Sequence, residues 1–195
     1  MLKEKYGYGK PIFVEDLSAS EAKVIEGSQD IKVFTSGIYY FPKTTTLGGV
    51  VHELPIEVSE VIERRYVTNG DDVYGYISGH TLRNLAGLTR QVPSFIEIST
   101  NNATELERNA FIGSKKVKTH KAPLTVTKDN AHKLQFLDLM TLIEPDHLDE
   151  TSMWLFREWL KENPITYTEL LPYIDVFPEN VKTNLENKVI KDEIT

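Results

Sequence analysis

Cysteine is absent from the 195-residue chain, which excludes disulfides, thiol catalysis and cysteine-based zinc sites. No apolar run approaches the roughly 20 residues that are needed to cross a bilayer. Residues 1–11 also lack the apolar centre of a signal peptide. We therefore expect a cytoplasmic protein that has no membrane partner, and the lack of cysteine fits a reducing compartment.

Sequence patterns that mark catalytic or metal sites are missing as well. The five histidines form no H-x-x-x-H pair, no G-x-S-x-G is present, and Gly48–Gly49 lacks the Lys-Ser/Thr of a phosphate loop. The acidic pairs Asp71–Asp72 and Asp149–Glu150 fit a turn and a helix start. We predict no catalytic residue, no metal and no cofactor. An enzyme that uses Asp or Glu with a metal is the weakest hypothesis.

The first 45 residues predict a small winged-helix-like domain. Pro11–Leu17 is a short helical candidate, and the S-x-x-E spacing of Ser18 and Glu21 predicts a capping box at the start of a helix over Ala19–Glu26. Strand-like runs at residues 31–34 and 38–41 then suit a tight hairpin. The residues from Pro42 to Leu54 are expected to be a loop and to contain the domain boundary.

Residues 46–195 predict a mixed α/β domain that becomes helical from about residue 130, which makes the chain an α+β protein. The stretch Tyr74–Thr100 is its scaffold: Gly79 precedes a helix, Gly87 ends it, and a strand follows Pro93. One apolar face of that helix is expected to contain Leu82, Leu85 and Ala86. The tail after Lys191 is expected to fray.

Charge is unevenly distributed in this acidic chain, whose formal net charge is −7. Residues 108–133 carry a net charge of +6, which includes four lysines close together: Lys115, Lys116, Lys118 and Lys121. Val117 is nearly the only apolar residue among them, so we predict an edge strand or exposed ribbon after a turn at Gly113–Ser114. Three roles stay open for the lysines: contact with nucleic-acid phosphates, docking on an acidic protein partner, and protection of a sheet edge.

Several motifs occur in the order in which they occur in one family. They are GIYYFPK at residues 37–43, YISGHTLRNLAGLTRQVP at 76–93, IEISTNN at 96–102 and KLQFLDLMTLIEP at 133–145. In this order the chain resembles the AbiEi-like antitoxins, the regulators of type IV toxin–antitoxin systems in abortive infection, a form of phage defence. The most specific part of the resemblance is the N-x-x-G-L-x-x-Q-V-P core, here Asn84, Gly87, Leu88, Gln91, Val92 and Pro93. Gly79, which precedes this core, belongs to the same structural motif.

The resemblance implies a DNA-binding transcriptional regulator with an N-terminal winged helix that binds inverted repeats in its own promoter. It also implies a C-terminal domain that neutralises a co-encoded nucleotidyltransferase toxin, and no catalysis. The residues that would contact operator DNA are Ser20, Lys23, Lys32 and Lys43. Because the helix over Ala19–Glu26 also holds two glutamates, the alternative is a protein-interaction or mobile-element accessory protein that has lost DNA binding.

Overall fold

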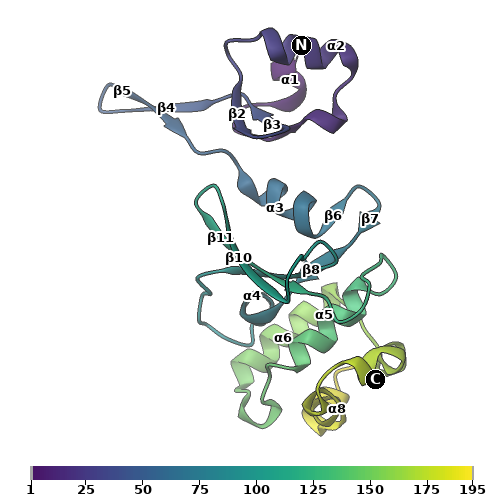
Figure 1. Cartoon of the computed structure of the whole chain (residues 1–195). Coiled ribbons are helices and arrows are strands. Elements are labelled where there is room, and N and C mark those ends of the chain that lie inside the picture. The colour runs from purple at the N-terminus through teal and green to yellow at the C-terminus, as the bar shows by residue number, and fades with distance from the viewer. Residues whose placement is uncertain (1, 195) are drawn as a thin grey trace. The chain divides into compact units, whose positions relative to one another are not determined.

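The computed structural model describes residues 2–194 and belongs to the α+β class, with a helical C-terminal part as predicted (Figure 1). The backbone divides into two compact units between Ile62 and Glu63, inside helix α3 (Val58–Tyr66). The sequence predicts a boundary after residue 45, and the first unit extends seventeen residues further, to Ile62.

The first unit contains short helices and two small sheets. Its elements, in chain order, are α1 (Leu2–Tyr6), β1 (Ile12–Phe13), the 3₁₀-helix η1 (Val14–Asp16), α2 (Ala19–Gly27), β2 (Lys32–Thr35), β3 (Ile38–Tyr40), β4 (Lys43–Leu47) and β5 (Val50–Leu54). The first three strands form an antiparallel sheet in the order β1-β3-β2. The predicted capping box is present, because the Ser18 hydroxyl accepts from the Glu21 N–H and the Glu21 carboxylate accepts from the Ser18 N–H.

Two sequence predictions in this unit were wrong. The predicted helix over Pro11–Leu17 is strand β1 followed by η1, because residues 12 and 13 are both buried and pair with β3. The predicted loop over Pro42–Leu54 contains the β4–β5 hairpin. Its strands are rich in β-branched residues, and Gly48–Gly49 turns the chain with φ values of +58° and +81°.

The second unit is built on a four-stranded sheet with strand order β10-β11-β9-β8. The strands are β8 (Gly75–Ile77), β9 (Ile96–Thr100), β10 (Glu107–Ile112) and β11 (Lys115–Lys121), and a separate hairpin comprises β6 (Thr68–Asn69) and β7 (Asp72–Val73). The lysine-rich strand β11 lies between β10 and β9, so our prediction of an edge strand was wrong. Its buried Val117 and Thr119 alternate with polar residues on the opposite face. Such a strand can lie inside a sheet that has one face exposed to solvent.

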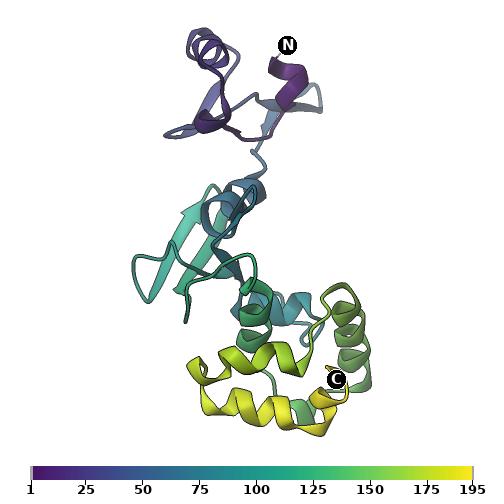
Figure 2. The same ribbon diagram turned by 90° about the vertical axis from the view of Figure 1, so that its right-hand side faces the viewer.

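Helices complete the second unit, and in Figure 2 those after residue 130 gather on one side of the sheet. The helices of this unit are α4 (Gly79–Leu85), α5 (Ala131–Met140), η2 (Pro145–His147), α6 (Glu150–Glu162), α7 (Tyr167–Leu170), η3 (Leu171–Val176), α8 (Glu179–Glu186) and α9 (Lys188–Lys191). Leu85 is 60% exposed and does not share the buried face of Leu82 and Ala86. The tail was expected to fray, but as far as it is described, to Ile194, it packs: Ile194 is buried and its carbonyl accepts a hydrogen bond from the N–H of Tyr167.

Candidate functional site

The residues predicted to contact DNA are all exposed in the first unit. Ser20 and Lys23 lie three residues apart on α2, and Lys23 and Lys43 form no ion pair within residues 2–194. Lys32 on β2 is bound instead to Glu53, with 2.5 Å between Nζ and Oε2. Lys23 and Lys43 are thus the lysines of this set whose charge no carboxylate offsets.

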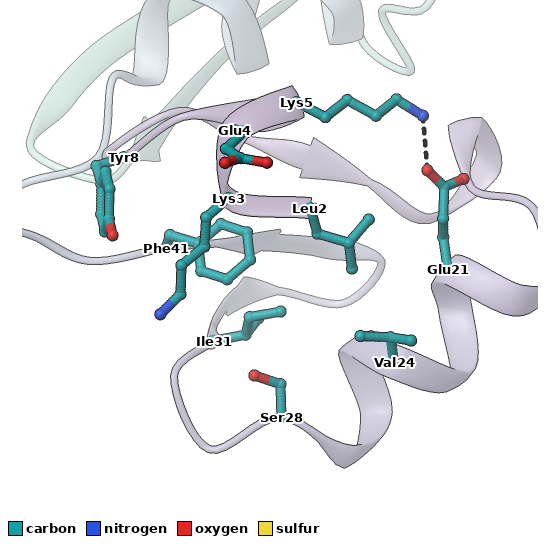
Figure 3. A pocket seen from close by; sticks show the side chains of 10 residues that line it. All are labelled: Leu2, Lys3, Glu4, Lys5, Tyr8, Glu21, Val24, Ser28, Ile31 and Phe41. Carbon is teal, nitrogen blue, oxygen red and sulfur yellow. Dashed lines mark hydrogen bonds and ion pairs between the residues drawn. The ribbon is translucent and has the colours of Figure 1, made fainter.

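An apolar groove lies beside α2 in the same unit, with a volume of about 980 Å³. Figure 3 shows side chains of α1, α2 and the following segments around it. Its apolar lining residues include Leu2, Val24, Ile31 and Phe41. An ion pair between Lys5 and Glu21, 2.6 Å long, joins α1 to α2 at its rim (Figure 3). The hydrogen bond from Lys5 is the main reason why the pKa of Glu21 is lowered to about 2.

The four lysines of β11 do not form one cluster. Lys116 and Lys118 lie on the same face of the sheet. Lys115 and Lys121, at the two ends of the strand, point to the opposite face, because side chains alternate along a strand. Lys118 forms an ion pair with Glu107 at 3.0 Å, and the Nζ of Lys116 lies 5.7 Å from the ring centre of Phe95. The four lysines of β11 therefore do not form a single phosphate-binding patch.

The residues that carry the family resemblance mostly support packing, as expected of a scaffold. The side chain of Asn84 donates hydrogen bonds to the carbonyls of Thr89 and Gln91, both at 3.2 Å, which holds the loop after α4. Gly87 has a φ of +73°, and a Cβ there would collide with the side chain of Leu155 on α6. Leu88 is in the main core, whereas Gln91 and Pro93 line a surface cavity of about 480 Å³.

A polar cluster that sequence analysis missed surrounds the start of α4. The carboxylate of Asp138, on α5, accepts a hydrogen bond from the N–H of Gly79 at 3.1 Å. The carboxylate of Glu97, on β9, accepts one from the N–H of His80 at 3.3 Å. The two carboxylates take the place of Ser78, the N-cap residue, whose side chain makes no capping bond. Gly79 has a φ of +57°, and a Cβ there would collide with Glu97, so this arrangement requires glycine.

His120 connects this cluster to the open face of the sheet. Its Nε2 lies 3.5 Å from Oε2 of Glu97, and its Nδ1 lies 3.8 Å from Oε2 of Glu107. The strand register places Glu107, His120, Ser99 and Tyr76 in one row across β10, β11, β9 and β8. The row runs from solvent at Glu107 to a buried phenol at Tyr76.

Burial dominates the electrostatics of the cluster. It raises the pKa of Asp138, and the charge of Glu97 acts in the same direction, whereas the Gly79 hydrogen bond and His120 oppose the shift. Burial, and then the charge of Asp138, also raise the pKa of Tyr76. The hydroxyl of Ser78 is buried and has no hydrogen-bond partner within the described residues. Unused hydrogen-bonding capacity therefore remains in this part of the structure.

A cavity of about 390 Å³ opens onto the cluster. Its lining includes the residues Ser78, Gly79, His80, Glu97, Ser99, His120, Lys121, Asp138 and Thr141. Its apolar lining residues are Pro123, Leu142, Val176, Phe177 and Pro178. Within residues 2–194, no three His, Asp or Glu residues are grouped so as to hold a metal ion. Ser78 has no base at its hydroxyl among these residues, so the arrangement suits binding better than nucleophilic chemistry.

Two signals in the sequence could have indicated this cluster. In β9 the polar Glu97 and Ser99 alternate with Ile96 and Ile98, which places two polar side chains on one face of a strand. Asp138 is the one acidic residue in the otherwise apolar second half of α5. Neither signal shows that the two carboxylates meet, because residues 97 and 138 come together only through the packing of α5 beside the sheet.

No family model, no curated protein and no solved structure matches this chain. Among residues 2–194, none of the helices combines the length and the apolar character that crossing a membrane requires.

Proposed function

We propose that the chain is an antitoxin-like transcriptional regulator of a type IV toxin–antitoxin system, acting in the cytoplasm. It would neutralise a co-encoded nucleotidyltransferase toxin and bind the operator of its own operon. The observation that supports the proposal is the element order of residues 2–40: helix, strand, short helix, helix and two strands, with sheet order β1-β3-β2. We infer from this order a winged helix in which α2 would be the recognition helix.

The surface of α2 sets how DNA would be contacted. Ser20 and Lys23 are exposed on this helix, and Lys43 is exposed at the start of β4. In this proposal Lys23 and Lys43 neutralise phosphates and Ser20 donates a hydrogen bond. Lys32 contributes less than the sequence suggested, because its charge is already offset by Glu53.

A mobility-shift assay on the DNA upstream of the gene, over a salt series, tests this part. The variant Lys23→Glu/Lys43→Glu should weaken binding and lower the slope of log affinity against log salt by about 2, since about one counterion is released per phosphate contact. Lys182→Glu/Lys188→Glu is the matched control, because both of its lysines are exposed in the second unit. Absence of a sequence-selective shift at low salt would remove the DNA-binding role.

Co-expression tests the antitoxin role independently of DNA binding. The protein encoded beside this chain should arrest growth when expressed alone, and co-expression of this chain should restore growth. A growth arrest that persists in the presence of the chain would contradict the antitoxin proposal. The Lys23→Glu/Lys43→Glu variant should still restore growth if the second unit carries neutralisation.

A second candidate is a protein-interaction or mobile-element accessory protein without DNA contact. Two observations favour it: residues 1–62 contain six lysines against nine acidic residues, and the groove beside α2 is apolar, which suits a protein side chain better than a phosphate. The variant Lys115→Glu/Lys116→Glu/Lys118→Glu distinguishes the candidates. Loss of partner binding in pull-down, with no DNA shift by the unaltered chain, would favour the interaction role.

A further inference from the structure

The cavity between β9, β11, α5 and the segment from Val176 to Pro178 is lined by two kinds of residue. The polar kind includes the carboxylates of Glu97 and Asp138 and the hydroxyl of Ser78, and the apolar kind comprises proline, leucine, valine and phenylalanine side chains. A volume of about 390 Å³ is within the usual range of small-ligand sites, roughly 300–1,000 Å³. The cavity is therefore large enough for a small amphipathic group.

Two groups in the cavity, the carboxylate of Asp138 and the hydroxyl of Ser78, have hydrogen-bonding capacity to spare. Asp138 accepts a single hydrogen bond, from Gly79, which leaves its second oxygen without a donor among the described residues. The hydroxyl of Ser78, 1% exposed, lines the cavity and has no partner there. Burying such groups without partners is unfavourable, so an occupant that donates hydrogen bonds would relieve the cost.

The charged groups around the cavity favour a cation over an anion. Glu97 and Asp138 are the acidic groups in the lining, and His80, His120 and Lys121 are its basic or titratable groups. His120 already faces the carboxylates of Glu97 and Glu107, and Lys121 is exposed at the end of β11 and forms no ion pair within residues 2–194. A metal ion is disfavoured, because the described residues hold no group of three His, Asp or Glu ligands.

We propose that this cavity binds a primary alkylammonium group, with Asp138, Glu97 and Ser78 accepting its N–H donors and Phe177, Leu142 and Pro178 contacting its alkyl chain. An alkylammonium ion has three donors on a compact charge and is protonated at neutral pH. The source of the group is either a free aliphatic amine or the lysine side chain of a partner protein. The site stands on the geometry of the second unit and does not depend on the antitoxin proposal.

The test uses the full chain, labelled with ¹⁵N and titrated with n-butylammonium chloride. The amide signals of Gly79 and His80 are the reporters, because these N–H groups bond to the two carboxylates. We expect saturable shifts of both signals with n-butylammonium and no shift with n-butanol, which has the same alkyl chain without the charge. Equal shifts with n-butanol, or no saturable shift with any amine, would overturn the proposal.

Variants identify the groups responsible. Asp138→Asn keeps an acceptor for the Gly79 N–H but removes the charge, and it should weaken binding at least about tenfold, the size of effect expected when a buried ion pair is lost. Asp129→Asn, at an exposed position outside the cavity, is the matched control and should bind as the unaltered chain does. Equal affinity of Asp138→Asn and the unaltered chain would contradict the assignment. If the spectrum of Asp138→Asn showed that this variant does not fold, Ser78→Ala would be used instead, and its affinity for n-butylammonium should be about threefold weaker.

N-acetyl-lysine methylamide distinguishes the two sources. Binding of n-butylammonium at least as tight as that of the lysine derivative indicates a free amine. Tighter binding of the lysine derivative indicates a partner's lysine, since the added peptide groups then contribute contacts. Both results support the site, whereas binding of neither compound rejects it.

Discussion

The two units differ greatly in how much apolar surface they bury. Among the described residues, the main cluster of the second unit contains eighteen buried residues, most of them on helices from α4 to α9. The cluster beside α2 in the first unit contains three, Ile12, Ile25 and Phe41, and the other buried apolar residues of this unit are Phe13, Ile56, Val58, Val61 and Ile62. Small units without disulfides or metals rarely gain more than about 3–5 kcal/mol from one core, so the first unit is expected to be marginally stable. The comparison indicates a stable C-terminal scaffold joined to a segment that unfolds more easily.

The largest effect is expected from the main core. Phe136 is fully buried, and its ring centre lies 6.4 Å from those of Phe156 and Trp159. Phe136→Ala should lower the free energy of unfolding of the second unit by about 3–5 kcal/mol, because it leaves a cavity as well as losing apolar contacts. Both tryptophans, Trp154 and Trp159, lie in this unit, so fluorescence during urea unfolding follows it. An unchanged midpoint would contradict the assignment of the core.

Ile25→Ala addresses the small core of the first unit. The expected loss is about 2–5 kcal/mol, which is comparable to all the stability that such a unit possesses. Amide hydrogen exchange should show the described residues of the first unit losing protection, while the fluorescence transition of the second unit stays in place. Val24→Ala is the control, because Val24 is on the same helix and 56% exposed. A shifted fluorescence transition in Ile25→Ala would show that the units are energetically coupled.

Each unit has one capping box, which allows the same change to be compared in both. Ser18 caps α2 with Glu21, and Thr166 caps α7 with Glu169. Ser18→Ala and Thr166→Ala should each cost about 1 kcal/mol. The loss should raise hydrogen exchange throughout the first unit but only near α7 in the second, since the second has more stability in reserve. Thr168→Ala, beside the second cap, should be neutral, and equal responses of the two units would count against the comparison.

Acid should affect the two units in opposite directions through two carboxyl groups. The pKa of Glu21 is lowered to about 2, chiefly by Lys5, so its contribution is present above the unfolded pKa and is lost as pH falls toward 2. The pKa of Asp138 is raised by burial, so its ionisation weakens the second unit, and stability returns as pH falls through the raised pKa. Glu21→Gln should remove the contribution of Glu21 to the pH dependence of stability, and Asp138→Asn should remove that of Asp138.

Unfolding by urea between pH 7 and pH 3 measures both contributions as differences between each variant and the unaltered chain. Subtracting the variants is needed because Asp149 and Glu169 in the second unit also have lowered pKa values and lose stability in acid. If Asp138→Asn left the pH dependence of the second unit unchanged, Asp138 would not be ionising in the environment described above.

Local sequence patterns predicted the elements well where the residues that determine the element lie close together in the sequence. The capping boxes at Ser18 and Thr166 and the helical end at Gly87 depend on residues within one or two turns of each other. The fold class and the helical C-terminal part were predicted for the same reason, since strongly periodic apolar segments carry their own signal. The β4–β5 hairpin lacks such a signal, because its strands are almost entirely exposed and pair only with each other, so no buried face marks them in the sequence.

Features that depend on contacts between distant segments were not predictable in this way. The inner position of β11 follows from its pairing with β9, about twenty residues earlier in the chain, and strand composition alone does not encode it. The ordering of Ile194 depends on Tyr167 and on burial in the core. The same holds for the site around Gly79, where Glu97 and Asp138 approach from a strand and a helix that the sequence separates.

The β4–β5 hairpin has a consequence for the behaviour of the protein in concentrated solution. Within residues 2–194 it is a two-stranded sheet, so both outer edges offer unpaired N–H and C=O groups along five-residue strands. Leu47, Val50 and Val51, near its turn, are each more than half exposed. Free edges with apolar side chains are templates for strand addition between molecules. Aggregation during concentration should therefore begin at this hairpin, and Val51→Lys should raise solubility without changing either core.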